Sequence, residues 1–534
     1  MNRKLVILFI SIALAFSLCS CQKNVSSTND DSSLAGWEKN ANDPVTLDWY
    51  VNYSWFVTGW GGNLVSDTIT EETGVTVNFI TPLGNEEEKL NALISSDSLP
   101  DIITLGWWET QYTEMVEQDM VYSLNELADQ YDPYFYEVAD EGVLNWYRWP
   151  DGNVYCYPNS SYTPKDLEEH DDIPSNQTFL VRKDIYEAIG SPDMTTIEGF
   201  YNAVKLAKEM FPTVNGEPLI PIGAHVFDET GCVSFDQYLQ NFLAVPWEEN
   251  GQYYDRNTDP EYIEWLKMFR KLSEEGYLSP DIFVDTRAQM SEKISDGRYF
   301  CMLYQRTDLA DQQKSLYDAN PDSIYIAVPG PKNSKGDDPV LPSTGITGWT
   351  VTLVSKNCKA PDRAIQFLSY LMSEHGQKMI FLGVEGQMYT EENGQIVINE
   401  DVERILNSDR ALYDATYGAD DAYWMLQDNV MQLQWKTEMF EPLKQLAEWT
   451  YPYTTYLGQY EIRQPQDPTL SAIYTNSNKL WSVTIKNLLL SESEEEFDSI
   501  MADYISKRAD MGFDKLLEEE TRQMNANKEK LGFK

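Results

Sequence analysis

The segment VTVNFITPLGNEEEKLNALISSDSLPDIITLGWW, residues 75–108, alternates strand and helix patterns and indicates the fold class. Residues 75–79 alternate apolar and polar side chains, as a half-buried strand does. Asn85 can cap the amphipathic helix that follows, and Pro100 ends this unit. The apolar residues 101–105 then predict a second strand.

The residues before this segment repeat the alternation. Residues 45–51 predict a strand, and residues 64–73 predict a helix that stops at Gly74, which tolerates a left-handed cap. The order strand, helix, strand, helix, strand implies a parallel sheet covered by helices. Ligands of such sheets bind beyond the carboxyl ends of the strands. Tryptophans follow two of these ends: Trp55, Trp60, Trp107 and Trp108.

A second α/β segment begins near Phe179. Its apolar strand, residues 298–304, ends at Gln305 and Arg306. A loop rich in Pro, Gly, Lys and Asp, residues 329–342, is a candidate crossover back to the first segment. About 514 residues remain once an N-terminal leader is removed, too many for one hydrophobic core. We therefore expect two lobes, followed by a helical C-terminal region.

The first 20 residues have the pattern of a bacterial lipoprotein signal. A basic start precedes an apolar run, residues 5–18, that is too short to span a bilayer comfortably. Leu18 stands three positions before Cys21, with a small residue directly before the cysteine. Two acyl chains on Cys21 would anchor the protein stably at the outer face of the cell membrane, with residues 21–43 as a flexible tether. An ordinary cleaved signal peptide with a chance cysteine is the alternative.

The charge balance excludes one class of partner. The chain has 40 Lys and Arg against 86 Asp and Glu, a net charge of −46, and loss of Arg3 and Lys4 with the leader moves it to −48. A surface this acidic repels phosphate backbones, so we expect no nucleic-acid partner. The acidic residues are spread along the chain, as in the soluble coat of an exported protein, and we expect a monomer.

Cysteine and histidine positions argue against a zinc site. No two cysteines have CxxC spacing, and the three histidines are scattered, so we expect neither a metal nor a cofactor. In an oxidising compartment, two disulfides remain open as an alternative to free thiols. Cys301 lies in the apolar run YFCMLY, which favours a buried core thiol there. The cysteines concerned are Cys156, Cys232, Cys301 and Cys358.

Several blocks in order along the chain resemble the extracellular solute-binding proteins, family 1, which feed ABC sugar importers. The resemblance is greatest to the large lipoprotein branch associated with oligosaccharides, and it covers nearly the whole mature chain. The blocks include EETGVTVNF from Glu71, LNALISSDSLPDIITLGWW from Leu90, FLVRKDIYEAIGSPD from Phe179, EEGYLSPDIF from Glu274, GRYFCMLY from Gly297 and GWTVTLVSKNCKAPDRAIQFLSYL from Gly348.

The resemblance implies the type II periplasmic-binding fold, in which two α/β lobes are joined by a hinge and each lobe is discontinuous. We expect residues 44–165 plus 343–405 in the first lobe, and residues 166–342 plus 406–534 in the second. It also implies that a sugar binds between the lobes, favours the closed form, and is delivered to the permease subunits of an ABC transporter.

Some large oligosaccharide-binding relatives carry an EF-hand-like calcium loop in the second lobe, and this chain departs from that pattern. Residues 210–217 lack the series of carboxylates. A near-match at residues 255–259 is followed by Pro260 where the tight turn needs glycine, and Leu266 occupies the position of the bidentate glutamate. We therefore expect no calcium.

Aromatic side chains are the main candidates for ligand contact, because sugar rings present apolar C–H faces that stack on aromatic planes. We expect stacking residues from the first lobe, hydrogen-bonding residues at the 298–304 strand end, and two further tryptophans that close the cleft from the opposite side. In that order these candidates are Trp55, Trp60, Trp107, Trp108 and Tyr162; Gln305 and Arg306; and Trp424 and Trp435.

Two other functions remain open from the sequence. An exported surface glycoside hydrolase would also combine an aromatic cleft with carboxylates, but 86 Asp and Glu residues make any chosen pair uninformative. No GxSxG or HExxH motif is present, so we expect no enzyme. A static surface adhesin is the third interpretation. Peptides or other small solutes are also compatible with this fold.

Overall fold

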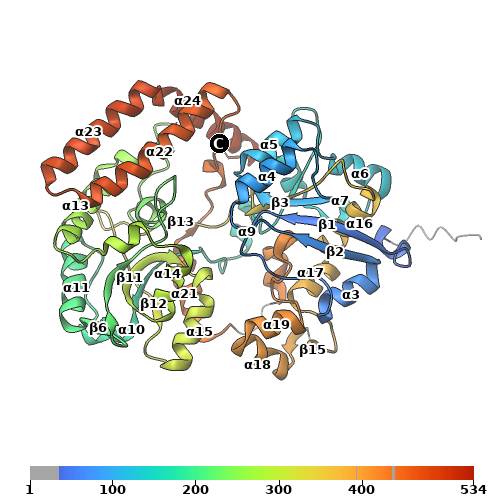
Figure 1. Ribbon diagram of the computed structural model, residues 1–534, viewed down its shortest axis with the longest axis horizontal. Helices are drawn as coiled ribbons and strands as arrows, with labels where there is room; N and C mark the ends of the chain where they lie inside the picture. The colour runs from blue at the N-terminus through green and yellow to red at the C-terminus, as the bar shows by residue number, and fades with distance from the viewer. Residues whose placement is uncertain (1–34, 393, 436–438, 534) are drawn as a thin grey trace, which may run out of the picture.

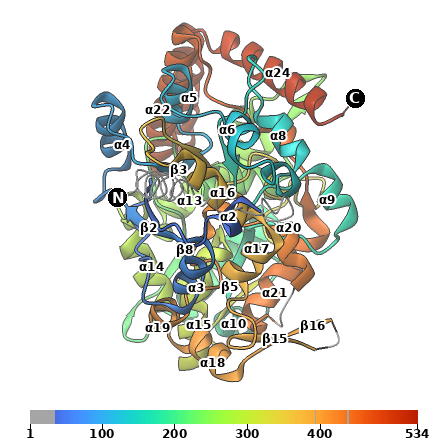
Figure 2. The same ribbon diagram turned by 90° about the vertical axis from the view of Figure 1, so that its right-hand side faces the viewer.

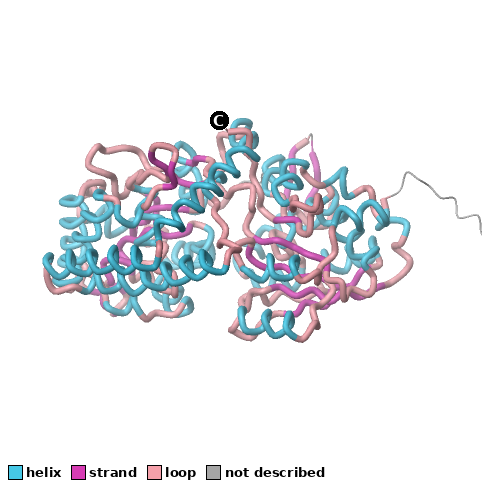
Figure 3. Tube along the Cα trace, turned by 90° about the horizontal axis from the view of Figure 1, so that it is seen from above, coloured by secondary structure: helices cyan, strands magenta, loops and turns pink. Residues whose placement is uncertain are grey.

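The computed structural model describes residues 35–392, 394–435 and 439–533. Cys21 and the signal sequence lie outside the described residues. Two α/β lobes lie side by side, each with its own sheet and hydrophobic core, as Figures 1 and 3 show. No helix in the described part of the chain is both long and apolar enough to cross a bilayer.

The first lobe is built on a five-stranded sheet with the strand order β2-β1-β3-β14-β4. β1, β2 and β3 are parallel, whereas β14 runs antiparallel to β3. The amino end of β14 therefore lies at the same sheet edge as the carboxyl ends of β1 and β3. The strands are β1 (Val45–Val51), β2 (Val75–Ile80), β3 (Ile102–Gly106), β4 (Tyr157–Pro158) and β14 (Thr350–Val354).

Helices cover this sheet, and local sequence explains where they begin and end. Asn63 caps the first turn of α3 by accepting a hydrogen bond from the Ser66 amide, and Gly74 ends α3 with a φ of 71°. The helices of this lobe are α2 (Gly36–Lys39), α3 (Leu64–Thr73), α4 (Glu86–Ser95), α5 (Thr110–Glu117), α6 (Leu124–Tyr131), α7 (Phe135–Val138), α8 (Glu141–Tyr147), α16 (Pro361–Met372), α17 (Glu374–Phe381), α18 (Glu400–Ser408), α19 (Arg410–Thr416) and α20 (Asn429–Gln432).

The second lobe has a four-stranded sheet with the order β12-β5-β11-β8. β11 is parallel to β8 and antiparallel to β5. Its strands and longer helices are β5 (Gln177–Arg182), β8 (Ile220–Gly223), β11 (Tyr299–Gln305), β12 (Tyr325–Ala327), α10 (Lys183–Ala188), α11 (Ile197–Met210), α13 (Pro260–Glu274), α14 (Arg287–Ser295), α15 (Ala310–Ala319) and α21 (Glu441–Thr450).

Three long C-terminal helices complete the second lobe, α22 (Pro468–Leu490), α23 (Glu494–Met511) and α24 (Phe513–Lys530). Apolar side chains of α22 and α23 enter the core of this lobe. α24 runs back towards the first lobe, where the Lys530 Nζ donates to the Trp146 carbonyl at 2.9 Å (Figure 1). The helical C-terminal region predicted from the sequence is thus part of the second lobe and also touches the first.

Core packing corrects the predicted boundary between residues 405 and 406. Tyr413, Tyr423 and Trp424 are buried in the core of the first lobe, so residues 406–426 belong there and not in the second lobe. Figure 2 shows α18, α19 and the β15–β16 hairpin (Tyr389–Glu392 and Gln395–Ile398) together at the base of this lobe.

The predicted tether also ends earlier than residue 43. Residues 36–39 form α2, and the Trp37 ring packs edge-on against Tyr370, with ring centroids 5.0 Å apart. The Asn40 Nδ2 donates to the Gln366 Oε1 at 2.8 Å. Aromatic packing and this hydrogen bond hold the segment against α16, so it is part of the first lobe.

The four cysteines of the described residues are all buried and free, which resolves the alternative left open by the sequence in favour of thiols. Cys301 lies in β11, as predicted.

Candidate ligand-binding site

Four aromatic residues of the first lobe form one cluster, which we call the aromatic platform: Tyr53, Trp55, Trp349 and Trp424. The Trp55 ring is nearly parallel to Trp349, at 11° and 5.9 Å between centroids, and stacks on Trp424 at 5.7 Å. Trp349 and Trp424 lie 4.6 Å apart. Trp424 is 7% exposed, whereas Trp55 is 51% exposed. The platform therefore has a buried base and one tryptophan available to a ligand.

Sheet topology brings these residues together. Trp55 lies in the loop that follows β1, and Trp349 directly precedes the antiparallel β14. The buried Asn159 links the two remaining pieces, because its backbone carbonyl accepts from the Trp349 amide at 3.3 Å and its Nδ2 donates to the Trp424 carbonyl at 3.1 Å. The backbone and the side chain of Asn159 therefore hold the backbone of Trp349 and of Trp424 in place.

A carboxylate lies beside the platform at the end of β3. The Glu109 Oε2 accepts from the Asn52 Nδ2 at 2.5 Å, and its Oε1 accepts from the Gly106 amide at 2.7 Å. The Asn52 Oδ1 in turn accepts from the Tyr50 hydroxyl at 2.8 Å. Burial raises the pKa of Glu109 to about 7, because desolvation disfavours its charged form. This network places a fixed hydrogen-bond acceptor near the aromatic surface.

Trp107 and Trp108 line a cavity at the edge of the first lobe. Their rings meet edge-to-face with centroids 6.0 Å apart, and Trp108 is nearly half exposed. The cavity holds about 210 Å³, and residues 463–466 of the segment before α22 form its other wall. Gly106 permits the Trp108 position, since a Cβ there would meet the indole ring at 2.7 Å. This cavity is therefore shared between the first lobe and the C-terminal region.

The second lobe contributes polar groups at the ends of β8 and β11. The Gln305 Nε2 donates to the Asp308 Oδ2 at 3.1 Å and lies 3.4 Å from the His225 Nε2. Burial lowers the pKa of His225, so the neutral imidazole is favoured. The Arg306 Nε donates to the Ser175 carbonyl at 2.9 Å, which ties this guanidinium to the segment entering β5.

Three of the predicted site residues, Tyr162, Trp424 and Trp435, are buried in the structure. Tyr162 is buried, and its amide donates to the Gly345 carbonyl between the lobes. Trp424 does not approach from the opposite side as expected, because it belongs to the first lobe. Trp435 is buried in a small cluster with Leu382 and Tyr389, which leaves its ring covered by protein.

Trp60 is held in the wall of the first lobe, where its Nε1 donates to the Thr70 Oγ1 at 2.9 Å. The sequence reasoning missed Tyr53, Trp349 and Glu109. Trp349 directly precedes a strand that the sequence predicts. It can be recognised as a site residue only if β14 is known to run antiparallel to β3, because this direction brings the start of β14 to the ligand-binding edge of the sheet.

The two segments that resemble calcium loops in the sequence make other contacts in the structure. Residues 213–218 form a tight hairpin with positive φ at Asn215 and Gly216. Asp255 makes a two-point ion pair with Arg508 of α23, which engages both carboxylate oxygens. The absence of calcium binding stays a prediction.

Comparison with known proteins shows similarity to bacterial solute-binding proteins. The family model described as bacterial extracellular solute-binding protein matches residues 65–386. Lipoprotein LipO of Bacillus subtilis is 20% identical over 417 residues, covering 74% of this chain and 75% of LipO.

Solved structures agree with the fold. The alginate-binding protein AlgQ2 without calcium ion has a TM-score of 0.67 and 18% identity, with 90% of this chain and 98% of that chain covered. The Streptococcus pneumoniae ABC-transporter substrate-binding protein FusA in complex with kestose also has a TM-score of 0.67, with 15% identity and coverage of 90% and 99%. The predicted α/β fold of two lobes is confirmed.

The matched family is one of non-catalytic binding proteins, which removes the glycoside hydrolase alternative. The family model covers more than half of the 534 residues. The chain therefore belongs to the bacterial extracellular solute-binding protein family.

Proposed function

We propose that this protein is the substrate-binding component of an ABC importer and that it captures an oligosaccharide between its two lobes. The half-exposed Trp55, stacked on the buried Trp424, is the observation that carries the proposal. A rigid aromatic plane beside a fixed carboxylate suits a sugar ring, whose C–H face stacks while its hydroxyls donate hydrogen bonds. The relatives support the same ligand class, since FusA was solved with kestose and AlgQ2 is named for alginate.

The binding steps follow from the positions of these groups. A sugar unit stacks on Trp55, and its hydroxyls reach Glu109, which the Asn52 side chain and the Gly106 amide already orient. Closure brings Gln305 of the second lobe to the same ligand, so the closed form gains contacts that the open form lacks. The permease of the importer then recognises the closed form. Trp107 and Trp108 extend the contact surface towards the C-terminal region.

Lipid attachment at Cys21 would place the protein at the outer face of the cell membrane. This part of the proposal rests on the signal pattern around Cys21, with support from the name of the relative LipO as a lipoprotein. Metabolic labelling with a fatty acid would detect the acyl chains, and Cys21→Ser should abolish the label and release the protein from the membrane fraction.

Ligand binding can be tested with a glycan panel. Thermal shift identifies the binding sugar, and calorimetry then compares wild type with Trp55→Ala. Loss of one stacked ring costs about 1.4 kcal/mol, so we expect Kd to rise about tenfold. Tyr131→Ala is the control, because Tyr131 is a partly exposed aromatic on α6 outside the site. Wild-type affinity in the Trp55→Ala variant would refute the role of the platform. Conversion of a bound sugar into cleavage products would refute a function limited to binding.

A further inference from the structure

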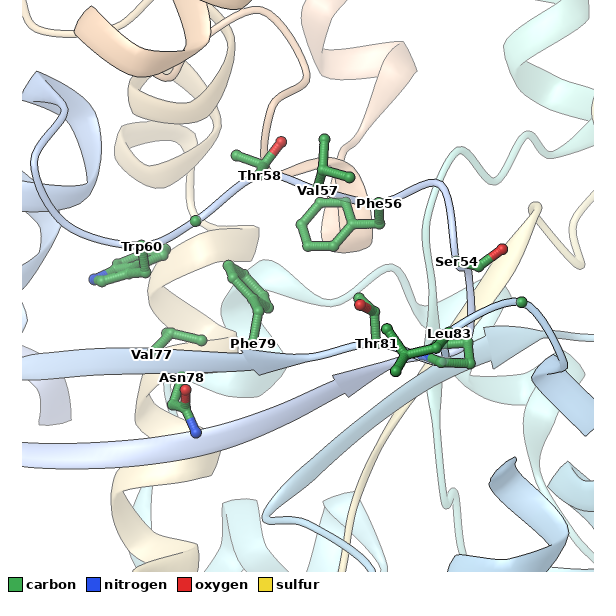
Figure 4. A pocket seen from close by; sticks show the side chains of 13 residues that line it. Ser54, Phe56, Val57, Thr58, Trp60, Val77, Asn78, Phe79, Thr81 and Leu83 are labelled. Atoms are coloured by element: carbon green, nitrogen blue, oxygen red, sulfur yellow. The ribbon is translucent and has the colours of Figure 1, made fainter. Parts of the chain in front are cut away.

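A groove of about 730 Å³ lies on the first lobe (Figure 4). Residues 54 and 56–60, in the loop after β1, form one wall, and residues 77–79 and 81–84, in β2 and the segment after it, form the other. Phe79 and Thr81 point from the β2 side towards the loop that carries Phe56. The groove has more than three times the volume of the cavity at Trp107 and lies within the usual size range of ligand pockets.

The aromatic side of the groove is held in place from behind. The Trp60 ring packs against Tyr423 with centroids 4.9 Å apart, and its Nε1 donates to Thr70. Phe79 packs edge-on against the buried Phe56 at 5.0 Å. A ligand that meets these half-buried rings would lose little side-chain entropy in ordering them, because the packing has already fixed their positions.

The lining carries hydroxyl and amide groups but no charge. None of the thirteen described residues that line the groove is charged, although the chain has 126 ionisable Lys, Arg, Asp and Glu residues. The hydroxyls of Thr58 and Thr81 make no hydrogen bond to any other described residue, so they are available to a ligand.

Two carboxylates contact residues that line the groove. Glu86 accepts from the Ser54 amide at 3.0 Å, and Asp48 accepts from the Asn78 Nδ2 at 2.7 Å. Both are acidic, so an anionic ligand would meet only like charge here.

Two apolar side chains stand at the rim of the groove without cover. Val57 is 88% exposed and Leu83 is fully exposed. Apolar rims, aromatic walls and uncharged hydroxyls together match the surface of an uncharged sugar, which presents C–H groups and hydroxyls. A phosphate or carboxylate ligand would instead need cationic partners, and the lining has none.

We infer that this groove is a second carbohydrate subsite on the first lobe, and that the ligand is a neutral oligosaccharide spanning the platform and the groove. Phe56 lines the groove and its ring packs edge-on against Trp424 of the platform, with centroids 6.0 Å apart, so the groove and the platform are neighbours in space. The inference rests on the proposed function. It adds that uronic-acid oligomers are excluded and that affinity rises with the length of a neutral chain.

The test uses calorimetry with gluco-, manno-, xylo- and fructo-oligosaccharides of two to six units and with oligogalacturonates and oligomannuronates of matched length. Thr81→Asp introduces a negative charge into the groove. We expect it to weaken binding of the longer neutral sugars at least about tenfold and to change disaccharide binding less than about twofold. Thr390→Asp, at an exposed position in β15, is the matched control.

The outcomes distinguish failure of the subsite from failure of the proposed function. Equal effects of Thr81→Asp and Thr390→Asp at every chain length would overturn the subsite while leaving the proposed function in place. Tighter binding of uronates than of neutral sugars would do the same. Failure of every probe to bind would overturn both proposals.

Hydrogen exchange on wild-type protein provides a check that needs no variant. The longest neutral sugar that binds should protect residues 54–60 and 77–84, and a disaccharide of the same series should not protect residues 77–84. Absence of protection at both segments with a saturating long sugar would overturn the subsite even if Thr81→Asp fails to fold.

Discussion

Replacing Glu461 with glutamine is expected to stabilise the protein at alkaline pH and to have a smaller effect at acidic pH. Glu461 lies between the lobes, and its carboxylate accepts a hydrogen bond from the Thr347 amide at 3.4 Å. It also approaches the backbone of Gly345 so closely that a Cβ there would meet the carboxylate at 2.1 Å. Desolvation in this position raises the pKa of Glu461 to about 7, against the opposing effects of the Thr347 hydrogen bonds and Arg463.

The direction of this pH dependence follows from the number of protons that the folded and unfolded states bind. The unfolded chain releases the Glu461 proton near pH 4.5, whereas the folded chain holds it until about pH 7. The unfolded state therefore binds fewer protons between these values, and stability falls as pH rises through this window. Between pH 5.5 and pH 8 the loss is about 2 kcal/mol for a fully buried group, and about 1–2 kcal/mol for Glu461, whose side chain retains some water contact.

Urea denaturation at pH 5.5 and pH 8 measures this loss. The difference in free energy of unfolding between Glu461→Gln and wild type should be about 1–2 kcal/mol larger at pH 8 than at pH 5.5, since glutamine does not ionise. Glu168→Gln, at an exposed position in α9 (Pro164–Glu169), is the control and should show the same difference at both values. A pH-independent effect of Glu461→Gln would refute the argument, because it would mean that folding does not perturb this carboxyl.

Two further substitutions test packing in each lobe. Asp236→Ala should lower the free energy of unfolding, measured in urea, by about 2–4 kcal/mol. The Trp481 indole and the Tyr262 hydroxyl, which donate to the Asp236 Oδ1 at 2.8 and 3.1 Å, would lose their buried acceptor. A loss below about 0.5 kcal/mol would contradict this prediction. Trp424→Ala should lower the free energy of unfolding, measured by thermal unfolding, by about 3–5 kcal/mol, because the Trp424 side chain is buried. Trp55 is half exposed, so Trp55→Ala should lower it by less than about 1.5 kcal/mol. Equal losses would contradict this difference in burial.

Local patterns predicted much of the secondary structure. The expected strand at residues 45–51 and helix at residues 64–73 coincide with β1 and α3, and Gly74 has the left-handed backbone expected of a helix cap. These features depend on side-chain periodicity and on termination signals within a few residues. The lipoprotein signal predicted around Cys21 also depends on a local pattern, and it remains a prediction from the sequence.

Contacts between distant segments required the tertiary structure. Trp349 reaches Trp55 because β14 runs antiparallel to β3, and strand direction is not encoded in the strand's own periodicity. The placement of residues 406–426 in the first lobe likewise depends on which core accepts Tyr423 and Trp424.

The sequence by itself determined that the chain is an α/β protein with aromatic residues at strand ends, because composition and periodicity are local properties. The tertiary structure decided which aromatic rings remain open to a ligand and which are packed inside. Trp55 and Trp435 are the same residue type, yet one is half exposed and the other buried. Exposure is set by neighbours that come from remote parts of the chain, and so is the pKa of a carboxyl such as Glu109.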